Sequence, residues 1–99
     1  GYVRVWTAHD AVGYGIPDGG DRFAIKQRTE SLSIPGTGFH AAFAAENHEA
    51  VNSFYSAAMK NGGIDNGAPG LREQYGPHYY AAFVLDPDGY RIEAIINEP

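Results

Sequence analysis

The chain has 99 residues, no cysteine and a formal net charge of −5 at pH 7. It is therefore long enough for at most one domain, and disulfides, thiolate metal sites and thiol nucleophiles are excluded. Its seven Lys and Arg residues form no basic stripe, which argues against nucleic acid and anionic membranes as partners. With no apolar run long enough to cross a membrane and no signal-peptide pattern, a cytoplasmic location is the default expectation.

The first third of the chain predicts a three-stranded antiparallel meander. Alternating or apolar segments joined by short turns predict strands over residues 2–6, 11–16 and 22–28. Gly13 and Gly15 interrupt the second strand, which is typical of a bulge or of a close approach to the backbone. A linker rich in Ser, Thr, Gly and Pro follows at residues 29–37.

The pattern then changes to a strand, a helix and a long loop. A short strand is predicted over residues 39–44. Asn47 can cap the following helix, whose apolar stripe at i, i+3, i+4 and i+7 comprises Val51, Phe54, Tyr55 and Ala58. Residues 64–77 are too rich in Gly and Pro for a long regular element. We expect a long loop with one short strand there, and such loops often carry function.

The closing segment, residues 79–96, reads as a β-hairpin around the turn Asp86-Pro87-Asp88-Gly89. Glu93 is out of character, because it lies inside a strand that should be largely buried. A carboxylate in such a place costs free energy unless it is paired, hydrogen-bonded or bound to a metal. The strand period of two places Arg91, Glu93 and Ile95 on one face.

A short internal repeat relates the two halves of the chain. Residues 20–25 can be laid on residues 89–94, and both segments follow a Pro-Asp-Gly turn. In this overlay Ala24 stands where Glu93 stands. Because the first half has three strands with nothing before them, we expect that it lacks an opening strand and helix. Either the chain is a fragment, or another polypeptide supplies those elements.

Four spaced motifs lie in the second half of the chain. They are FHAAF (39–43), AAMKNGG (57–63), DNGAPGLR (65–72) and YYAAFVLDPDG (79–89), the last followed by IEA (92–94). Together they resemble the vicinal oxygen chelate superfamily, which includes glyoxalase I, bleomycin-resistance and fosfomycin-resistance proteins and extradiol dioxygenases. The resemblance is greatest to the small glyoxalase-like branch. The first 37 residues fit this family only as the strands of a first module.

The resemblance implies an α+β fold of two βαβββ modules that form a half-open barrel, often completed in a dimer. Residues 1–37 would be a partial first module that lacks its opening strand and helix. Residues 38–99 would be the second module, and together the two would form one domain. The concave face would hold a metal, with ligands from the first and last strands of each module.

In the second module the ligand positions match His40 and Glu93. In the first module the last-strand position is Ala24, which cannot ligate, and the first-strand position is not in this sequence. A site with three protein ligands and open positions suits Fe(II), Mn(II), Ni(II) or Zn(II) and a bidentate oxygen substrate. This chain alone supplies two ligands.

Both ligand candidates also have a plainer interpretation. His40 can be a histidine at a strand start that bonds to a turn. For Glu93 the alternative is a cross-strand ion pair with Arg91, Arg22 or Lys26. The partnership of the two residues, and the small Ala42 and Ala44 on the face of His40, favour a site in which Glu93 is a metal ligand or a catalytic base.

Four further residues are candidates for substrate binding. Arg72, in the Gly/Pro-rich loop, could bind a substrate carboxylate or phosphonate, or it could be a solvated loop charge. Tyr75, Tyr79 and Tyr80 could supply hydroxyl groups to an apolar pocket. Of the adjacent Tyr79 and Tyr80, only one can face that pocket.

The leading hypothesis is a metal-dependent protein of the glyoxalase/dioxygenase-like group that binds two vicinal oxygens of a small substrate. Whether it is an enzyme stays open; if it is, a lyase, isomerase or dioxygenase-like reaction is expected. The rivals are a metal-free protein that sequesters a drug or metabolite, and an inactive truncated form. Expected partners are the small molecule and either a second copy in a homodimer or a second chain that supplies the missing strand and helix.

Overall fold

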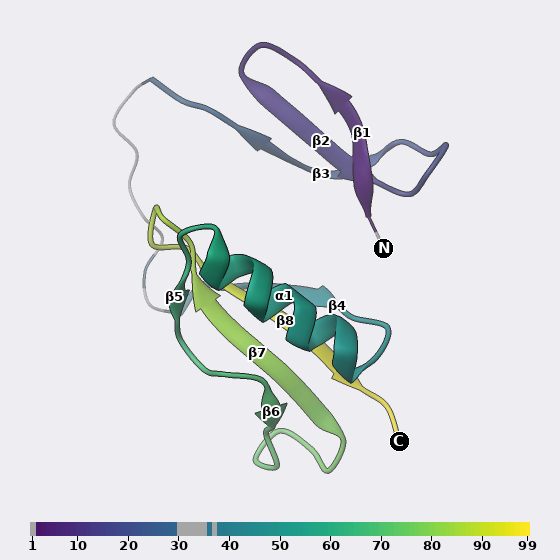
Figure 1. Ribbon diagram of the computed structural model, residues 1–99, viewed down its shortest axis with the longest axis vertical. Helices are drawn as coiled ribbons and strands as arrows, with labels where there is room; N and C mark the ends of the chain where they lie inside the picture. Colours follow the sequence, from purple (N-terminus) through teal and green to yellow (C-terminus); the bar gives the residue numbers. More distant parts are fainter. Residues whose placement is uncertain (1, 30–35, 37) are drawn as a thin grey trace. The chain divides into compact units, whose positions relative to one another are not determined.

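The computed structural model describes residues 2–29, 36 and 38–99. It divides into a unit within residues 1–33 and a unit within residues 34–99, shown in Figure 1. The described residues contain one helix and eight strands in two sheets, which confirms the predicted α+β class. Most of the linker predicted over residues 29–37 lies outside the described residues, as does the predicted module boundary.

The first unit is a three-stranded antiparallel sheet in the order β1-β2-β3. The strands are β1 (Val3–Thr7), β2 (Ala11–Gly15) and β3 (Asp21–Lys26). The predicted meander is therefore confirmed, with strand ends shifted by one or two residues. The register shifts between Tyr14 and Gly15 where β2 pairs with β3.

Gly13 and Gly15 have separate structural reasons. A Cβ atom on Gly13 would lie 2.2 Å from Nε1 of Trp6, whose ring covers this position. A Cβ atom on Gly15 would lie 2.2 Å from the backbone oxygen of Gly20 and 3.0 Å from Cα of Asp21. The expectations of a close approach and of an irregularity are both confirmed. The Trp6 ring can rotate away, whereas the backbone near Gly15 cannot.

Gly15→Ala is expected to destabilise the first unit by about 2–3 kcal/mol, because the added methyl overlaps backbone atoms of the facing strand. Gly20→Ala is the matched control, since a Cβ there meets no atom within 4 Å. Both substitutions reduce the freedom of the unfolded chain equally, an effect that stabilises by up to about 1 kcal/mol. Urea denaturation and amide hydrogen exchange of β2 and β3 would measure the difference. Equal stability of the two variants would contradict this role of Gly15.

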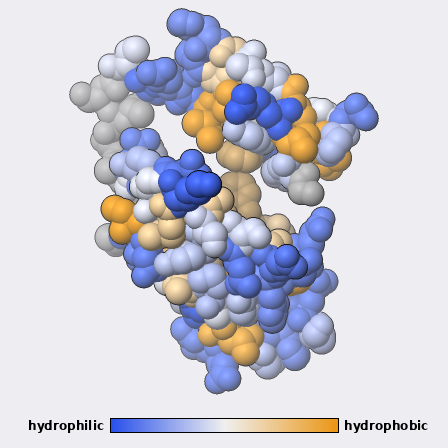
Figure 2. All heavy atoms as spheres, viewed as in Figure 1, coloured by the Kyte–Doolittle hydropathy of each residue, from blue (hydrophilic) through white to orange (hydrophobic). Residues whose placement is uncertain are grey.

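The first unit leaves much of its apolar surface exposed. Ile16 is 49% and Ile25 57% exposed, and Figure 2 shows orange apolar side chains on the surface of this unit. Among its described residues only Gly13 and Gly15 are buried. Hydrophobic stabilisation scales with the apolar area removed from water. Most of this stabilisation in the described chain therefore comes from the second unit.

The second unit has a five-stranded sheet in the order β4-β8-β7-β5, with β6 also paired to β7. The strands are β4 (Ala41–Ala44), β5 (Ile64–Asp65), β6 (Gly70–Leu71), β7 (Tyr79–Leu85) and β8 (Arg91–Asn97). β4 runs parallel to β8, and the other pairs are antiparallel. β8 therefore lies between β4 and β7, with partners on both sides.

Helix α1 (His48–Lys60) begins at the predicted cap. The Asn47 side chain accepts a hydrogen bond from the backbone N–H of Ala50 at 2.7 Å, which satisfies one of the free donors of the first turn. At the other end, the N–H of Asn61 bonds to the last carbonyls, and Gly62 follows with φ of 97°. Within the described residues, no helix is long and apolar enough to cross a membrane.

The core lies between α1 and one face of the sheet. Val51, Ala82 and Ala94 are buried there, and the partly buried side chains packed around them are Ala45, Phe54, Tyr55, Tyr80 and Ile96. Even-numbered positions of β7 and β8 thus face the helix, and Figure 1 shows α1 lying over these two strands. Odd-numbered positions face the other side, because side chains alternate along a strand.

The loop after the helix differs from the expectation of one short strand. Two short strands, β5 and β6, pair with β7. Between them Phe83 exchanges backbone hydrogen bonds with its neighbours, accepting from the N–H of Asn66 at 2.9 Å and donating to the carbonyl of Gly67 at 2.8 Å. The expectation of one strand was wrong because two-residue strands are too short for a period-of-two signal.

The hairpin turn at Asp86 has the predicted chemistry. The N–H of Gly89 donates to the carbonyl of Asp86 at 2.9 Å, and Gly89 has φ of 89°. The Asp86 side chain also accepts from the backbone N–H groups of Asp88 and Tyr90, at 2.9 and 2.8 Å. The turn therefore sets the register of β7 against β8, which places Phe83 opposite Glu93.

Candidate functional site

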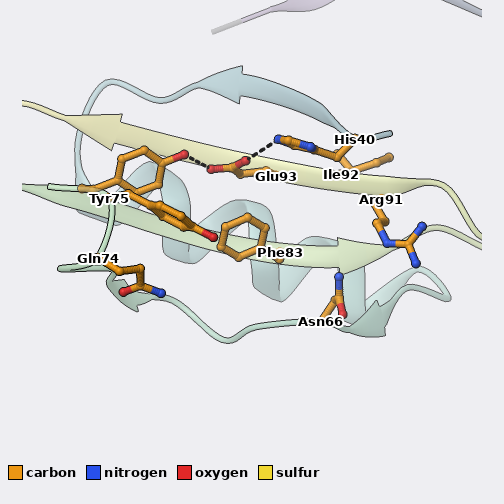
Figure 3. Close-up of a pocket in the computed structure, with 9 residues that line it drawn as sticks. His40, Asn66, Gln74, Tyr75, Phe83, Arg91, Ile92 and Glu93 are labelled. Atoms are coloured by element: carbon orange, nitrogen blue, oxygen red, sulfur yellow. Dashed lines mark hydrogen bonds and ion pairs between the residues drawn. The ribbon is translucent and has the colours of Figure 1, made fainter. Parts of the chain in front are cut away.

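A cavity of about 630 Å³ opens on the face of the second-unit sheet that does not carry the helix (Figure 3). Its lining comes mainly from odd-numbered positions of β7 and β8, together with Ile92 of β8, the residue before β4 and the segments on either side of β6. The lining residues are His40, Asn66, Gln74, Tyr75, Tyr79, Phe83, Arg91, Ile92 and Glu93. The pocket thus combines aromatic walls with several polar groups, as small-molecule sites commonly do.

Glu93 is the most buried polar group of this pocket, with 1% of its surface exposed. It lies in the middle of β8, next to Phe83 of β7 and Ala42 of β4. Its Oε1 atom is 3.3 Å from Nε2 of His40, and its Oε2 atom accepts a hydrogen bond from the Tyr79 hydroxyl. Both carboxylate oxygens therefore have partners, which offsets the cost of burying the charge.

His40 reaches Glu93 from the neighbouring strand. Ala42 pairs with Glu93, and His40 precedes it by two residues, on the same face. The imidazole is 52% exposed, so it lies at the mouth of the pocket while Glu93 lies at the bottom. Among the described residues, the ion pair of Glu93 is with His40 and not with the arginines or the lysine considered from the sequence.

Tyr79 is a neutral hydrogen-bond donor in this pocket. Burial, together with its hydrogen bond to Glu93, raises the pKa of Tyr79 to about 12. The Tyr75 ring stands edge-on to the Tyr79 ring, at 5.1 Å between centroids. Tyr75 is itself largely exposed, so it forms the outer wall at that end of the pocket.

Tyr79→Phe should remove one late step from the alkaline titration of the seven tyrosines. The ordinary pKa is about 10, and that of Tyr79 is raised to about 12. The protonated form is therefore favoured by folding. This contribution to stability is complete below pH 10 and is lost as the pH rises from about 10 through about 12.

Absorbance of tyrosinate would be followed against pH in the wild type and in both single variants. Tyr75→Phe is the control, since it also removes one hydroxyl, and that hydroxyl makes no hydrogen bond within the described residues. The wild type minus Tyr79→Phe difference should show one proton released near pH 12. A difference centred on pH 10 would contradict the Tyr79–Glu93 bond.

The structure does not bring Tyr80 to the pocket. Its ring lies on the helix side of the sheet, stacked on His48 with 3.8 Å between ring centroids. Its hydroxyl donates to Oδ1 of Asn52 at 2.7 Å. Since only one of two adjacent strand residues can face the pocket, the earlier assignment is corrected: Tyr79 faces the pocket and Tyr80 packs against α1.

Arg72 lies beside the pocket and does not line it. Its guanidinium donates to the carbonyl of Gly70 at 2.9 Å and to that of Ala68 at 2.7 Å. It also lies over the Phe83 ring, 5.3 Å from the centroid. Its N–H donors therefore stabilise the backbone between β5 and β6. Arg72 contacts Phe83, which lines the pocket, but does not line the pocket itself.

Five lining residues were not among the sequence-based site candidates: Asn66, Gln74, Phe83, Arg91 and Ile92. A signal existed for Arg91, because it stands two positions from Glu93 on the same strand face. From the sequence, Arg91 is expected only as an ion-pair partner of Glu93. Asn66 and Gln74 lie in irregular segments, where no periodicity indicates which side chains point inward.

His40 and Glu93 could supply two of the ligands of a metal site. An imidazole nitrogen and a carboxylate oxygen 3.3 Å apart can share one ion, because metal–ligand bonds of about 2.1 Å place adjacent ligands at such separations. However, the described residues contain no group of three or more His, Cys, Asp or Glu that could hold a metal. His40 and Glu93 would therefore need at least one further ligand.

Comparisons with known proteins point to one fold. No protein-family model and no curated protein matches the chain. A solved glyoxalase/bleomycin resistance protein from Albidiferax ferrireducens T118 is similar, at 29% identity and a TM-score of 0.71, covering 91% of this chain and 71% of that one.

Two more distant structures share the fold. One is a glyoxalase/bleomycin resistance protein/dioxygenase family enzyme from Burkholderia phytofirmans PsJN, with 17% identity, a TM-score of 0.65, and coverage of 98% of this chain and 80% of that one. The other is a hypothetical protein from S. aureus, with 16% identity, a TM-score of 0.68, and coverage of 96% and 75%.

Proposed function

We propose that this chain, which has the glyoxalase-like fold that the sequence motifs predicted, is a member of the vicinal oxygen chelate superfamily, and from that premise we propose a function for the pocket. His40 and Glu93 contribute to a divalent-metal site that binds a small substrate with two neighbouring oxygens. The observation that carries this proposal is the convergence of the His40 and Glu93 side chains, 3.3 Å apart, on one pocket.

Residues of this chain would bind the metal, orient its carboxylate ligand and exclude water. His40 would bind through Nε2, which requires the neutral imidazole. Glu93 would bind through Oε1, while the Tyr79 hydroxyl holds Oε2 and so fixes the carboxylate plane. Bound there, a divalent ion supplies Lewis acidity toward the two substrate oxygens. Phe83 and Tyr75 would exclude water from the bound substrate.

The remaining ligand would come from outside the described residues of this chain. A second copy in a homodimer, or a second chain, is the source that we propose, since Ala24 offers no donor at the equivalent position of the first unit. That the metal is Fe, Mn, Ni or Zn stays a prediction, which rests on the nitrogen and oxygen donors of the two ligands. The cytoplasmic location also stays a prediction.

A metal-free sequestering protein is the second candidate. Both Glu93 oxygens already have protein partners, and no buried side-chain nitrogen or oxygen lacks a partner among the described residues. The aromatic residues Tyr75, Tyr79 and Phe83 could then bind a planar drug or metabolite without a metal.

Metal content separates these candidates. The purified protein would be stripped with chelator and dialysed against Fe(II), Mn(II), Ni(II) or Zn(II) in turn. Bound metal per chain would then be compared with the oligomeric mass from light scattering. One ion per site, with a mass that includes the ligand-donating partner, supports the proposal. A metal-free protein that binds planar aromatics favours sequestration, and binding of neither indicates an inactive form.

A further inference from the structure

We propose that the pocket selects ligands carrying a carboxylate, which the Arg91 guanidinium and the Asn66 side-chain amide bind at one end. This deepens the proposed function of the same pocket and rests on it for the position of the ligand's other oxygens. Figure 3 shows Arg91 and Asn66 at one end, Gln74 and Tyr75 at the other, and Phe83 and Glu93 between them.

Arg91 is a partly buried cation with unused donors. It opens β8, opposite Leu85 of β7, and lines the pocket. Within residues 2–29, 36 and 38–99, no hydrogen bond or ion pair engages its guanidinium. A guanidinium stays charged at all accessible pH values and presents five donors in a planar fork that matches a carboxylate. An anionic ligand would satisfy these donors.

Three nearby carboxylates already have other partners. Asp86 accepts from the backbone of its own turn, Asp65 accepts from the N–H of Gly67 at 2.9 Å, and Glu93 is held by His40 and Tyr79. These acids stabilise turns or form the centre of the site. The counter-ion for Arg91 would therefore come with the ligand.

Asn66 is positioned by its backbone. Its N–H donates to the carbonyl of Phe83, so the residue is anchored to β7 while its side chain lines the pocket. The amide N–H₂ can donate to a carboxylate oxygen that Arg91 binds from the other side. A second donor of this kind restricts the orientation of the carboxylate.

Arg72 sharpens the assignment because its donors are already used. It bonds to the carbonyls of Gly70 and Ala68, whereas Arg91 has no such partner among the described residues. The sequence favoured Arg72 as the anion-binding residue, and the geometry points to Arg91. Arg72 is then a positioning residue for the Phe83 wall.

The spacing limits the size of the ligand. Arg91 and Glu93 are two residues apart on one face, which corresponds to about 7 Å along the strand. Phe83 lies beside Glu93 on β7 and supplies an apolar surface next to the carboxylate. The ligand class is therefore a small planar carboxylic acid with neighbouring oxygens on its far side.

The test compares 3,4-dihydroxybenzoate with 3,4-dihydroxybenzamide, which differ in charge at one end only. Anaerobic calorimetry on the chelator-treated protein should give tighter binding of the acid by about tenfold or more, as expected for hydrogen bonds to a charged group. Arg91→Gln should remove this preference, and Arg91→Lys should keep part of it because it keeps the charge without the fork.

Lys60→Gln is the matched control. It removes the same charge from an exposed position of α1, on the other side of the sheet, and should keep the full preference. Equal affinity for acid and amide, no binding of either, or a preference that survives Arg91→Gln would overturn the proposal. The wild-type comparison decides the case even if a variant does not fold.

Repeating the titrations with metal separates this inference from the function on which it rests. An acid preference without metal uptake removes the metal role and leaves carboxylate recognition. Metal uptake without acid preference removes carboxylate recognition and leaves the metal role.

Discussion

Glu93→Gln should lower the metal affinity of the protein by more than about 100-fold, since loss of a residue that merely supports a ligand already costs 10- to 100-fold. Glutamine has nearly the shape of glutamate but no charge. It can still accept the Tyr79 hydrogen bond, so the pocket should keep its form while losing an anionic donor. The variant therefore separates ligand chemistry from folding.

Glu98→Gln is the control for this experiment, because Glu98 is an exposed acid just beyond β8. Both variants lower the negative charge of the chain equally. Metal per chain after dialysis and circular dichroism would be measured side by side. Unchanged metal content in Glu93→Gln would exclude Glu93 as a ligand and leave it as a hydrogen-bonded structural carboxylate.

Ala82→Asp should destabilise the second unit by about 3–5 kcal/mol, the cost of an uncompensated buried charge. Ala82 has no exposed surface and packs with Val51 and Ala94 under the helix. An aspartate there would find no partner in this apolar cluster. Since domains of this kind are stable by only about 5–15 kcal/mol, this loss is a large fraction of the free energy of unfolding and should lower the urea midpoint clearly.

The same chemical group is tolerated on the other face of the sheet, where Glu93, which precedes Ala94 in β8, has His40 and Tyr79 as partners. Ala57→Asp, at an exposed position of α1, is the control and should cost no more than about 1 kcal/mol. Urea denaturation followed by near-UV circular dichroism would measure both. A native-like Ala82→Asp variant would show that this face admits water.

Several elements were predictable because their signals are local. Asn47 caps the helix, Gly89 adopts the positive φ of its turn, and Gly15 lies at a strand irregularity. Each depends on the geometry of a few consecutive residues. The pairing of His40 with Glu93 came from the family motifs together with the misplaced charge of Glu93, and the structure brings the two side chains together. Their role as ligands stays a prediction.

Other features depended on which strands are neighbours. Tyr79 and Tyr80 are chemically identical, and only the position of α1 decides that Tyr80 faces the helix. The sequence indicated Arg72 as the cation available to a ligand. In the structure its guanidinium donates to the carbonyls of Gly70 and Ala68 instead. β5 and β6 exist because β7 offers them backbone partners.

The amino-acid sequence by itself determined the longer strands, the helix and the turn at Asp86, because periodicity, capping and turn chemistry act over short distances, and its motifs indicated the glyoxalase-like fold. The tertiary structure alone decided which polar groups are already satisfied. Whether a polar group has a hydrogen-bond partner depends on residues distant in the chain. Among the described residues, the Arg91 guanidinium has no such partner, so its donors are available to a ligand.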